Sequence, residues 1–257
     1  AKKFVKINKD WEKMMFRASD TKSVIQCCAN EVLRNTLPVL YNDLEKCQKS
    51  LEGYLEQKRS KFSRFYFVSN PVLLVILSQG SDPLQMQPYY EKVFDSVSHV
   101  VHDAGDKTLI TQLQSIAGSD METIQLIRNV RTAGNIEEWL TDLENTMQRS
   151  MKGLCEVMAV GCMQQPLRQF VNATCAQLSL LGLQISWTAH SFDAIARSKG
   201  NKNSMLENNR LQGVLLQELS AWCLEELGSS MNRRKIETLV TIQLHQHDVF
   251  ADMVRLF

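Results

Sequence analysis

The sequence predicts a mainly α-helical fold, an elongated rod of helical bundles that carries one small β-hairpin. Long stretches place apolar residues three and four positions apart, which is the helical period rather than the strand period. Only 11 glycines and 5 prolines occur in 257 residues, so few positions are unsuited to a helix. The segment 108–127 instead has two β-tolerant runs separated by Ala-Gly-Ser-Asp, and it is the single strand pair that we predict.

The N-terminal part is expected to hold two helices in succession. Ser19 or Asp20 can cap the first helix, and Pro38 should kink or break it because proline lacks the N–H that a helix interior needs. The second helix has an apolar stripe with spacings of three and four, typical of a bundle or coiled-coil seam. The stripe consists of Leu40, Leu44, Cys47, Leu51 and Leu55.

Residues 62–88 change character and predict a compact junction. An aromatic, β-prone run comes first, and Ser-Asn-Pro, a short apolar run and a proline-bounded turn follow it. Ser69 or Asn70 can cap a short helix with Pro71 at its first position, where a missing N–H costs nothing. We expect bending at this junction and at the hairpin region 108–124, because both interrupt stiff helices.

The helical pattern resumes after Gly134 and continues to the C-terminus. The first helix here has seven regularly spaced apolar residues, namely Ile136, Leu140, Leu143, Met147, Met151, Leu154 and Met158. Pro166 can begin the next helix, the polar loop 198–204 ends it, and Gly228 ends a further one before the helix-compatible segment 233–257. The chain therefore divides into three segments. They are a helical bundle segment of a rod at 1–62, a junction with short helices and the β-hairpin at 63–135, and a second helical bundle segment at 136–257.

Composition argues against several classes of partner. The 29 basic and 28 acidic residues give a formal net charge of +1, so no global field attracts the chain to nucleic acid or to an anionic membrane. The seven cysteines include no Cys-x-x-Cys pair, which indicates reduced thiols in the cytoplasm. No signal peptide is present, and no run approaches the ~18 apolar residues of a membrane span. A start at Ala1 and an uncapped Val-Arg-Leu-Phe end indicate a piece of a longer polypeptide.

No residue is predicted to be catalytic, to bind a cofactor or to ligate a metal. A phosphate-binding loop needs Gly-x-x-x-x-Gly-Lys-Ser/Thr, and the nearest segment, 200–204, lacks the first glycine and a preceding strand, so we interpret it as a solvated loop. The pairs His99/His102 and His245/His247 lack a metal-binding frame and are interpreted as surface or capping histidines.

Three further kinds of cluster have ordinary structural interpretations. Adjacent carboxylates, as at Glu137 and Glu138, are interpreted as solvated charge beside an amphipathic face. The basic clusters in 58–64 and 233–235 are interpreted as helix-end charge that complements the dipole, although either could meet an acidic partner. The methionines at 147, 151 and 158 are interpreted as core.

The run 51–79 resembles the most characteristic stretch of the dynein heavy chain linker. It contains Tyr-Leu-Glu-x-Lys-Arg, a phenylalanine, Arg-Phe-Tyr-Phe, Ser-Asn and Leu-Leu-x-Ile-Leu-Ser-Gln in that order. Family-like residues then continue through almost the whole chain, at Asp82-Pro83, Gln87-Pro88, Phe94, Glu138-Trp139-Leu140, Gln184-Ile185, Trp187-Thr188, Gln243, His245-Gln246 and Asp248-Val249. Two departures are Ser63, where the family commonly has proline, and 118–122, which replaces Ser-x-Glu-Gly-Glu in the hairpin. Details such as Gly-Asn-Ile-Glu-Glu-Trp-Leu are most similar to an axonemal outer-arm heavy chain.

The resemblance implies a non-catalytic, mechanical part of a microtubule motor, similar to the C-terminal half of the linker. Its partners would be the AAA+ ring of the same heavy chain, other dynein chains and, indirectly, microtubules. ATP and magnesium would bind in the ring and not in this segment. The segment would transmit ATP-driven changes of the ring into force for ciliary or flagellar beating. The implied location is the cytoplasm and its cytoskeleton, in the axoneme of a cilium or flagellum.

Two other classes of function remain open from the residues alone. The first is a helical scaffold or tether that binds another protein through an exposed stripe. The second is an enzyme, which would need a pocket that brings together one cysteine, one histidine and an orienting carboxylate.

Overall fold

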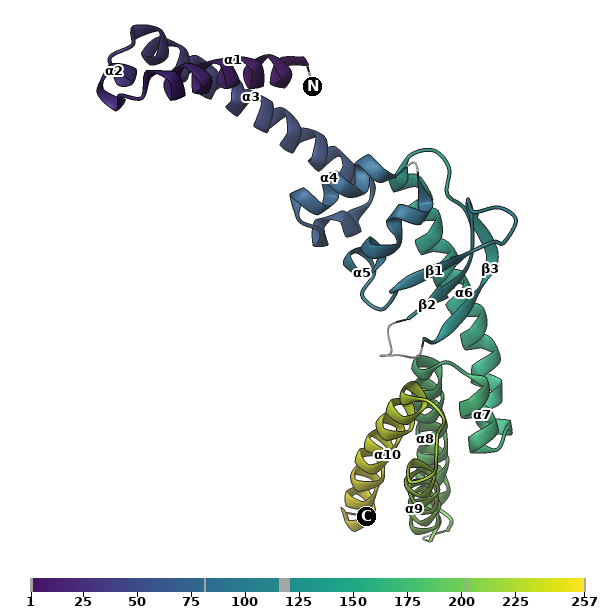
Figure 1. Ribbon diagram of the computed structural model, residues 1–257. Coiled ribbons are helices and arrows are strands. Elements are labelled where there is room, and N and C mark those ends of the chain that lie inside the picture. Colours follow the sequence, from purple (N-terminus) through teal and green to yellow (C-terminus); the bar gives the residue numbers. More distant parts are fainter. Residues whose placement is uncertain (1, 81, 116–120, 202, 257) are drawn as a thin grey trace. The chain divides into compact units, whose positions relative to one another are not determined.

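The fold is mainly α-helical, as predicted. The computed structural model describes residues 2–80, 82–115, 121–201 and 203–256, and within these ranges it has ten α-helices, two 3₁₀ helices and three strands (Figure 1). The chain forms two compact units, Ala1–Ser78 and Gln79–Phe257. The three-segment division at 62/63 and 135/136 stays a prediction, as does the rod.

The first unit begins with the helices α1 (Lys2–Thr21), α2 (Val24–Cys28) and α3 (Glu31–Lys61). The predicted cap at Ser19 or Asp20 is wrong, because both residues lie inside α1. The chain breaks instead at Lys22, which has a φ of 53°. Asn30 caps α3, since its side chain accepts hydrogen bonds from the backbone N–H groups of Val32 and Leu33.

Pro38 lies inside the continuous helix α3, so the expected break is wrong, and the alternative that Pro38 kinks the helix stays a prediction. An interior proline costs about 3 kcal/mol of helix stability because one hydrogen bond is lost. Here α1 packs against α3 on both sides of the proline, where Leu33 and Leu40 contact the cluster of Ile7 and Met14. Burial of apolar side chains in this contact offsets the loss, so tertiary packing overrides the local signal.

The apolar stripe of α3 is only partly buried within the first unit. Leu40 and Leu55 are buried, whereas Leu44 is 45% exposed and Leu51 is 42% exposed. The helix therefore does not form a continuous coiled-coil seam with another helix of this unit.

The predicted junction consists of short helices. In the first unit, η1 (Ser63–Phe67) follows α3, and α4 (Asn70–Gln79) comes next with Pro71 in its first turn. The aromatic run that looked β-prone forms the 3₁₀ helix η1, and Phe65 within it is fully buried. In the second unit, η2 (Pro83–Tyr89) and α5 (Tyr90–Val93) lead into the sheet.

The predicted β-hairpin is present as part of a three-stranded antiparallel sheet. Strands β2 (Leu109–Gln114) and β3 (Thr123–Arg131) pair with Leu113 opposite Ile124. The strand β1 (His99–His102) was not predicted; it pairs with β2 on its other side. The substituted turn at Gly118, Ser119 and Asp120 lies outside the described residues.

Five helices complete the second unit. They are α6 (Ile136–Gln164), α7 (Leu167–Ala173), α8 (Ala176–Ser198), α9 (Ser204–Cys223) and α10 (Ser230–Leu256). The single helix predicted after Pro166 is in fact α7 and α8, because Thr174 and Cys175 have extended backbone angles between them. The predicted end at the 198–204 loop is confirmed. The end predicted at Gly228 is wrong, because α9 ends at Cys223; Gly228, which has a φ of 69°, lies in the connection between α9 and α10.

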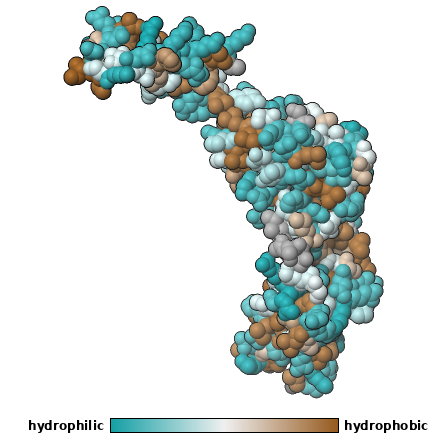
Figure 2. Space-filling view, in the orientation of Figure 1, coloured by the Kyte–Doolittle hydropathy of each residue, from teal (hydrophilic) through white to brown (hydrophobic). Residues whose placement is uncertain are grey.

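One apolar core of the second unit contains side chains from each of the helices α6 to α10. Its buried members are Met158, Phe170, Val171, Leu178, Leu183, Leu219, Trp222, Ile236 and Leu239. Met158 and Met151 lie in or against this cluster, so the interpretation of the methionines as core is confirmed for these two. Exposed apolar side chains of α9 include Leu206, Leu211 and Val214. Figure 2 shows brown, hydrophobic atoms among the teal ones at the surface of the C-terminal helices.

Two glycines give a matched test of this core. A Cβ on Gly182 of α8 would lie 2.3 Å from Phe170 Cζ and 3.0 Å from Met158 Sδ, whereas a Cβ on Gly153 of α6 would meet nothing within 4 Å. We expect Gly182→Ala to lower the free energy of unfolding by about 1–3 kcal/mol through overpacking. Gly153→Ala should raise it by up to about 1 kcal/mol, because alanine favours a helix. Urea denaturation of both variants tests this, and equal effects would contradict the packing described.

Candidate functional site

The strongest candidate site is a set of polar ties that fix the connections between helices. The first tie centres on Arg59, in the last turn of α3. Its Nε donates to the backbone carbonyl of Phe65 at 3.3 Å. Its Nη2 donates to the carbonyl of Val68 at 3.1 Å and to Oδ1 of Asn70 at 2.7 Å. One guanidinium therefore binds α3, η1 and the start of α4 together.

Aromatic side chains pack around this tie. The Arg59 guanidinium carbon lies 6.0 Å from the centre of the Tyr66 ring, and the Tyr66 hydroxyl donates to Glu56 Oε1 at 2.5 Å. The hydrogen bond to Glu56 raises the pKa of Tyr66 above its usual value. Phe62 and Phe65 meet edge to face with ring centres 5.0 Å apart. The end of α3 is thus held by both polar and apolar contacts.

Side chains also close both edges of the sheet in the second unit. At the β1 edge, Gln87 of η2 donates from Nε2 to the Val100 carbonyl at 2.7 Å, and its Oε1 accepts from the Val100 N–H at 3.1 Å. At the β3 edge, the Ile127 N–H donates to Ser150 Oγ of α6 at 2.9 Å. An open edge can pair with another strand, so these contacts protect the sheet and attach it to its neighbours.

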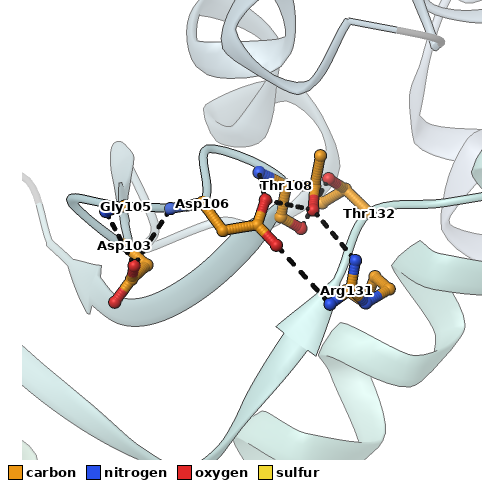
Figure 3. A network of polar contacts seen from close by, with 6 residues as sticks. All are labelled: Asp103, Gly105, Asp106, Thr108, Arg131 and Thr132. Carbon is orange, nitrogen blue, oxygen red and sulfur yellow. Dashed lines mark hydrogen bonds and ion pairs between the residues drawn. The ribbon is translucent and has the colours of Figure 1, made fainter.

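The loop between β1 and β2 is fixed by a third network (Figure 3). Oδ1 of Asp103 accepts from the N–H groups of Gly105 and Asp106 at 2.9 and 3.1 Å. Oδ1 of Asp106 accepts from the Thr108 N–H and hydroxyl, and Oδ2 lies 3.5 Å from Arg131 of β3. The hydrogen bonds from Thr108 hold the pKa of Asp106 below its usual value, and Arg131 adds to this effect. The loop is therefore held by hydrogen bonds among its own residues and is tied to β3 through Arg131.

A fourth tie joins the hairpin to the C-terminal helices. Glu122, just before β3, accepts a hydrogen bond at 2.8 Å from the Ala176 N–H at the start of α8. Lys235 of α10 donates to the carbonyls of Val171 and Thr174 at the end of α7. Burial lowers the pKa of the Lys235 ammonium, while the nearby Glu122 carboxylate opposes that shift. Lys235 thus supplies partners for helix-end carbonyls that have none within α7.

The structure separates the residues that were candidates for chemistry. His99 and His102 lie at the two ends of the strand β1, and His247 contacts Asp248 on α10. Within the described residues, no group of three or more His, Cys, Asp and Glu side chains could hold a metal ion. The loop around Gly200 follows the helix α8 rather than a strand, and Lys202 in it lies outside the described residues. That no residue of this chain is catalytic or binds a cofactor stays a prediction.

The basic clusters have two different environments. Lys58, Arg59 and Lys61 lie in the last turn of α3, as helix-end charge should. The interpretation is wrong for 233–235, because this cluster lies near the start of α10, where positive charge opposes the dipole. Its position is explained by Lys235, which caps α7 instead of its own helix. None of the described helices is long and apolar enough to serve as a membrane span.

Comparison with known proteins shows the family of this chain. The family described as "Dynein heavy chain, N-terminal region 2" matches residues 1–158. The chain belongs to the dynein heavy chain family. It is 41% identical over 258 residues to mouse dynein axonemal heavy chain 5, covering 98% of this chain and 6% of the relative. It is 36% identical over 257 residues to the dynein gamma chain of the flagellar outer arm of Chlamydomonas reinhardtii, covering 99% of this chain and 6% of the relative.

The similarity extends to human dynein axonemal heavy chain 8, at 37% identity over 259 residues, with 100% of this chain and 6% of the relative covered. This chain is therefore a region of an axonemal dynein heavy chain, and it spans about 6% of the length of these relatives. The dynein-like motif 51–79 contains the Arg59 tie from Glu56 to Asn70. Residues of this motif thus connect the end of α3 to the start of α4 through the hydrogen bonds of Arg59.

The Arg59 tie can be tested by removing the guanidinium. We expect Arg59→Met to lower the free energy of unfolding of the first unit by about 2 kcal/mol, because the partners of charged hydrogen bonds are left behind. Arg59→Lys should also destabilise it, since an ammonium cannot reproduce the fork that reaches three acceptors. Hydrogen exchange of the amides in 62–73 measures the effect. The control is Lys49→Met, which removes an exposed ion pair 3.8 Å long and should change little.

His102 should make the stability of the second unit depend on pH. Burial lowers the pKa of its imidazole, and both ring nitrogens are shielded from solvent. The unfolded chain, with a histidine pKa of about 6.5, then binds more protons than the folded chain, so stability falls as pH drops below that value. We expect His102→Gln to reduce the fall in melting temperature between pH 7 and pH 5. An equal fall in the parent and the variant would show that other groups cause it; His245→Gln, at an exposed site on α10, is the control.

Proposed function

We propose that this chain is a mechanical linker segment of an axonemal dynein, which transmits ATP-driven changes of the AAA+ ring into force on microtubules. The observation that carries the proposal is the Arg59 tie. A force-transmitting segment must not yield where one helix ends and the next begins, and here one side chain joins three successive elements. The match to the dynein heavy chain family supports the same role.

The proposed partners follow from the family. The AAA+ ring of the same heavy chain and other dynein chains would contact this segment, and microtubules would be reached only through the rest of the motor. The segment itself would be non-catalytic, with ATP and magnesium bound in the ring. The proposed location is the axoneme of a cilium or flagellum, since the relatives named above are axonemal or flagellar heavy chains.

A helical tether that only holds another protein is the second candidate function. The exposed apolar residues Leu44 and Leu51 on α3 favour it, because an unpartnered stripe can bind a partner helix. The two functions differ in whether they tolerate a flexible insertion in the chain. A tether works when lengthened, whereas a force transmitter loses displacement to any flexible insert.

A flexible insert in the full-length motor tests the proposal. We expect a short Gly-Ser insert after Gly80, near the boundary of the two units, to reduce microtubule gliding speed severalfold while nucleotide binding at the ring is retained. The same insert after Asn201, in the loop between α8 and α9, is the control and should leave gliding nearly unchanged. Gliding at the parental speed with the first insert would favour the tether and contradict the linker proposal.

A further inference from the structure

The helices α9 and α10 pack antiparallel through a core that is interrupted in its middle. Toward the turn that joins them, Leu219 and Ile236 belong to the large apolar cluster. At the far end, Met205 and Phe250 belong to a separate apolar cluster with Ala194 of α8. Between the two clusters, each helix buries two amide side chains instead of apolar ones. These four residues, which we call the amide layer, are Asn208, Gln212, Gln243 and Gln246, and each is at most 7% exposed.

One pair in the amide layer is hydrogen-bonded. The Nε2 of Gln243 donates to Oε1 of Gln212 at 2.8 Å and to its backbone carbonyl at 3.2 Å. Three other buried amide atoms of the layer have no hydrogen-bond partner among the described residues: Gln243 Oε1, Gln246 Oε1 and Asn208 Nδ2. A buried polar atom without a partner destabilises a fold, so apolar residues here would be more favourable for stability alone. The layer therefore needs an explanation other than stability.

The register of the two helices supplies that explanation. The pairing of Gln212 with Gln243 is the one that also brings Met205 to Phe250 and Leu219 to Ile236. A shift of α10 by one turn in one direction would place Gln212 opposite Leu239 and Gln243 opposite the shorter Asn208, and the opposite shift would place Gln243 opposite Leu216. In either shifted register the Gln212–Gln243 pair is lost, and one of its two amides faces a leucine. Apolar contacts are not directional and can re-form after such a shift, whereas the observed register is the one that matches amide with amide on both helices.

We infer that the amide layer is a register lock, which holds α10 at one position along α9 at the expense of stability. The lock resists sliding along the helix axis, the motion that a load parallel to the helices would produce. A single buried polar residue fixes register in helical coiled coils by the same physical means. The inference rests on the contacts of α9 and α10 and does not depend on the proposed role of the chain.

The test replaces the bonded pair by apolar residues of the same length and reads the register directly. The variant is Gln212→Met together with Gln243→Met in the 257-residue chain. Nitroxide labels on a genetically encoded keto amino acid at the exposed positions Arg210 and His245 leave the natural cysteines in place. Pulsed electron resonance should give one narrow distance for the parent. The double variant should give a broadened or second distance, with a melting temperature no lower than that of the parent.

Two comparisons make the result decisive. Gln243→Met alone leaves the Gln212 amide buried without its partner, so its melting temperature should fall below that of the double variant. Gln217→Met, at an exposed position of α9, should change neither the distance nor the melting temperature. One narrow, unchanged distance in the double variant would overturn the inference. Loss of helical structure in the double variant would also overturn it, because the two apolar clusters should hold the helices together without the amide pair.

Discussion

The geometry of the first unit depends on the contact between the Arg59 guanidinium and the backbone that follows α3. A helix of 31 residues can transmit displacement along its length, but its last carbonyls and the turn after it are weak points. Arg59 supplies donors to the Phe65 and Val68 carbonyls and to the Asn70 side chain, which are groups that a turn leaves unpaired. The same requirement recurs in the second unit, where Lys235 binds the end of α7 and Glu122 binds the start of α8.

The sequence predicted the elements of this fold better than their connections. The regular spacing from Ile136 to Met158 predicted α6, and the paired β-tolerant runs predicted β2 and β3. Both patterns can be read along a single element, because they show which of its faces is apolar. A helix break was expected at Pro38 because the helix α1 was not predicted. The side chains of α1 pack against α3 on both sides of the proline. The strand β1 was missed because it is short and its outer edge pairs with a side chain, Gln87, rather than with another strand.

The polar ties were harder to foresee for a physical reason. Arg59 and Lys235 both looked like helix-end charges, yet their acceptors lie 6 to 11 positions away for Arg59 and more than 60 positions away for Lys235. Periodicity carries no information about contacts over such separations. The aromatic residues after Arg59 were the available signal for the first tie. Nothing in the residues around Lys235 indicated that it binds α7 rather than its own helix.

Apolar packing and polar ties have complementary mechanical properties in this chain. Apolar clusters such as that of Met158, Phe170 and Leu219 supply most of the cohesion, but their contacts are short-ranged and tolerate small displacements along a helix. The hydrogen bonds that Arg59 and Lys235 donate, and the one that Ser150 accepts from Ile127, add little net stability each, yet each is satisfied at only one relative position of the elements that it joins. A fold built for stability alone would bury fewer polar groups. Directional contacts fix the relative positions of the elements that they join, and in this chain they lie where helices end and where the sheet meets α6.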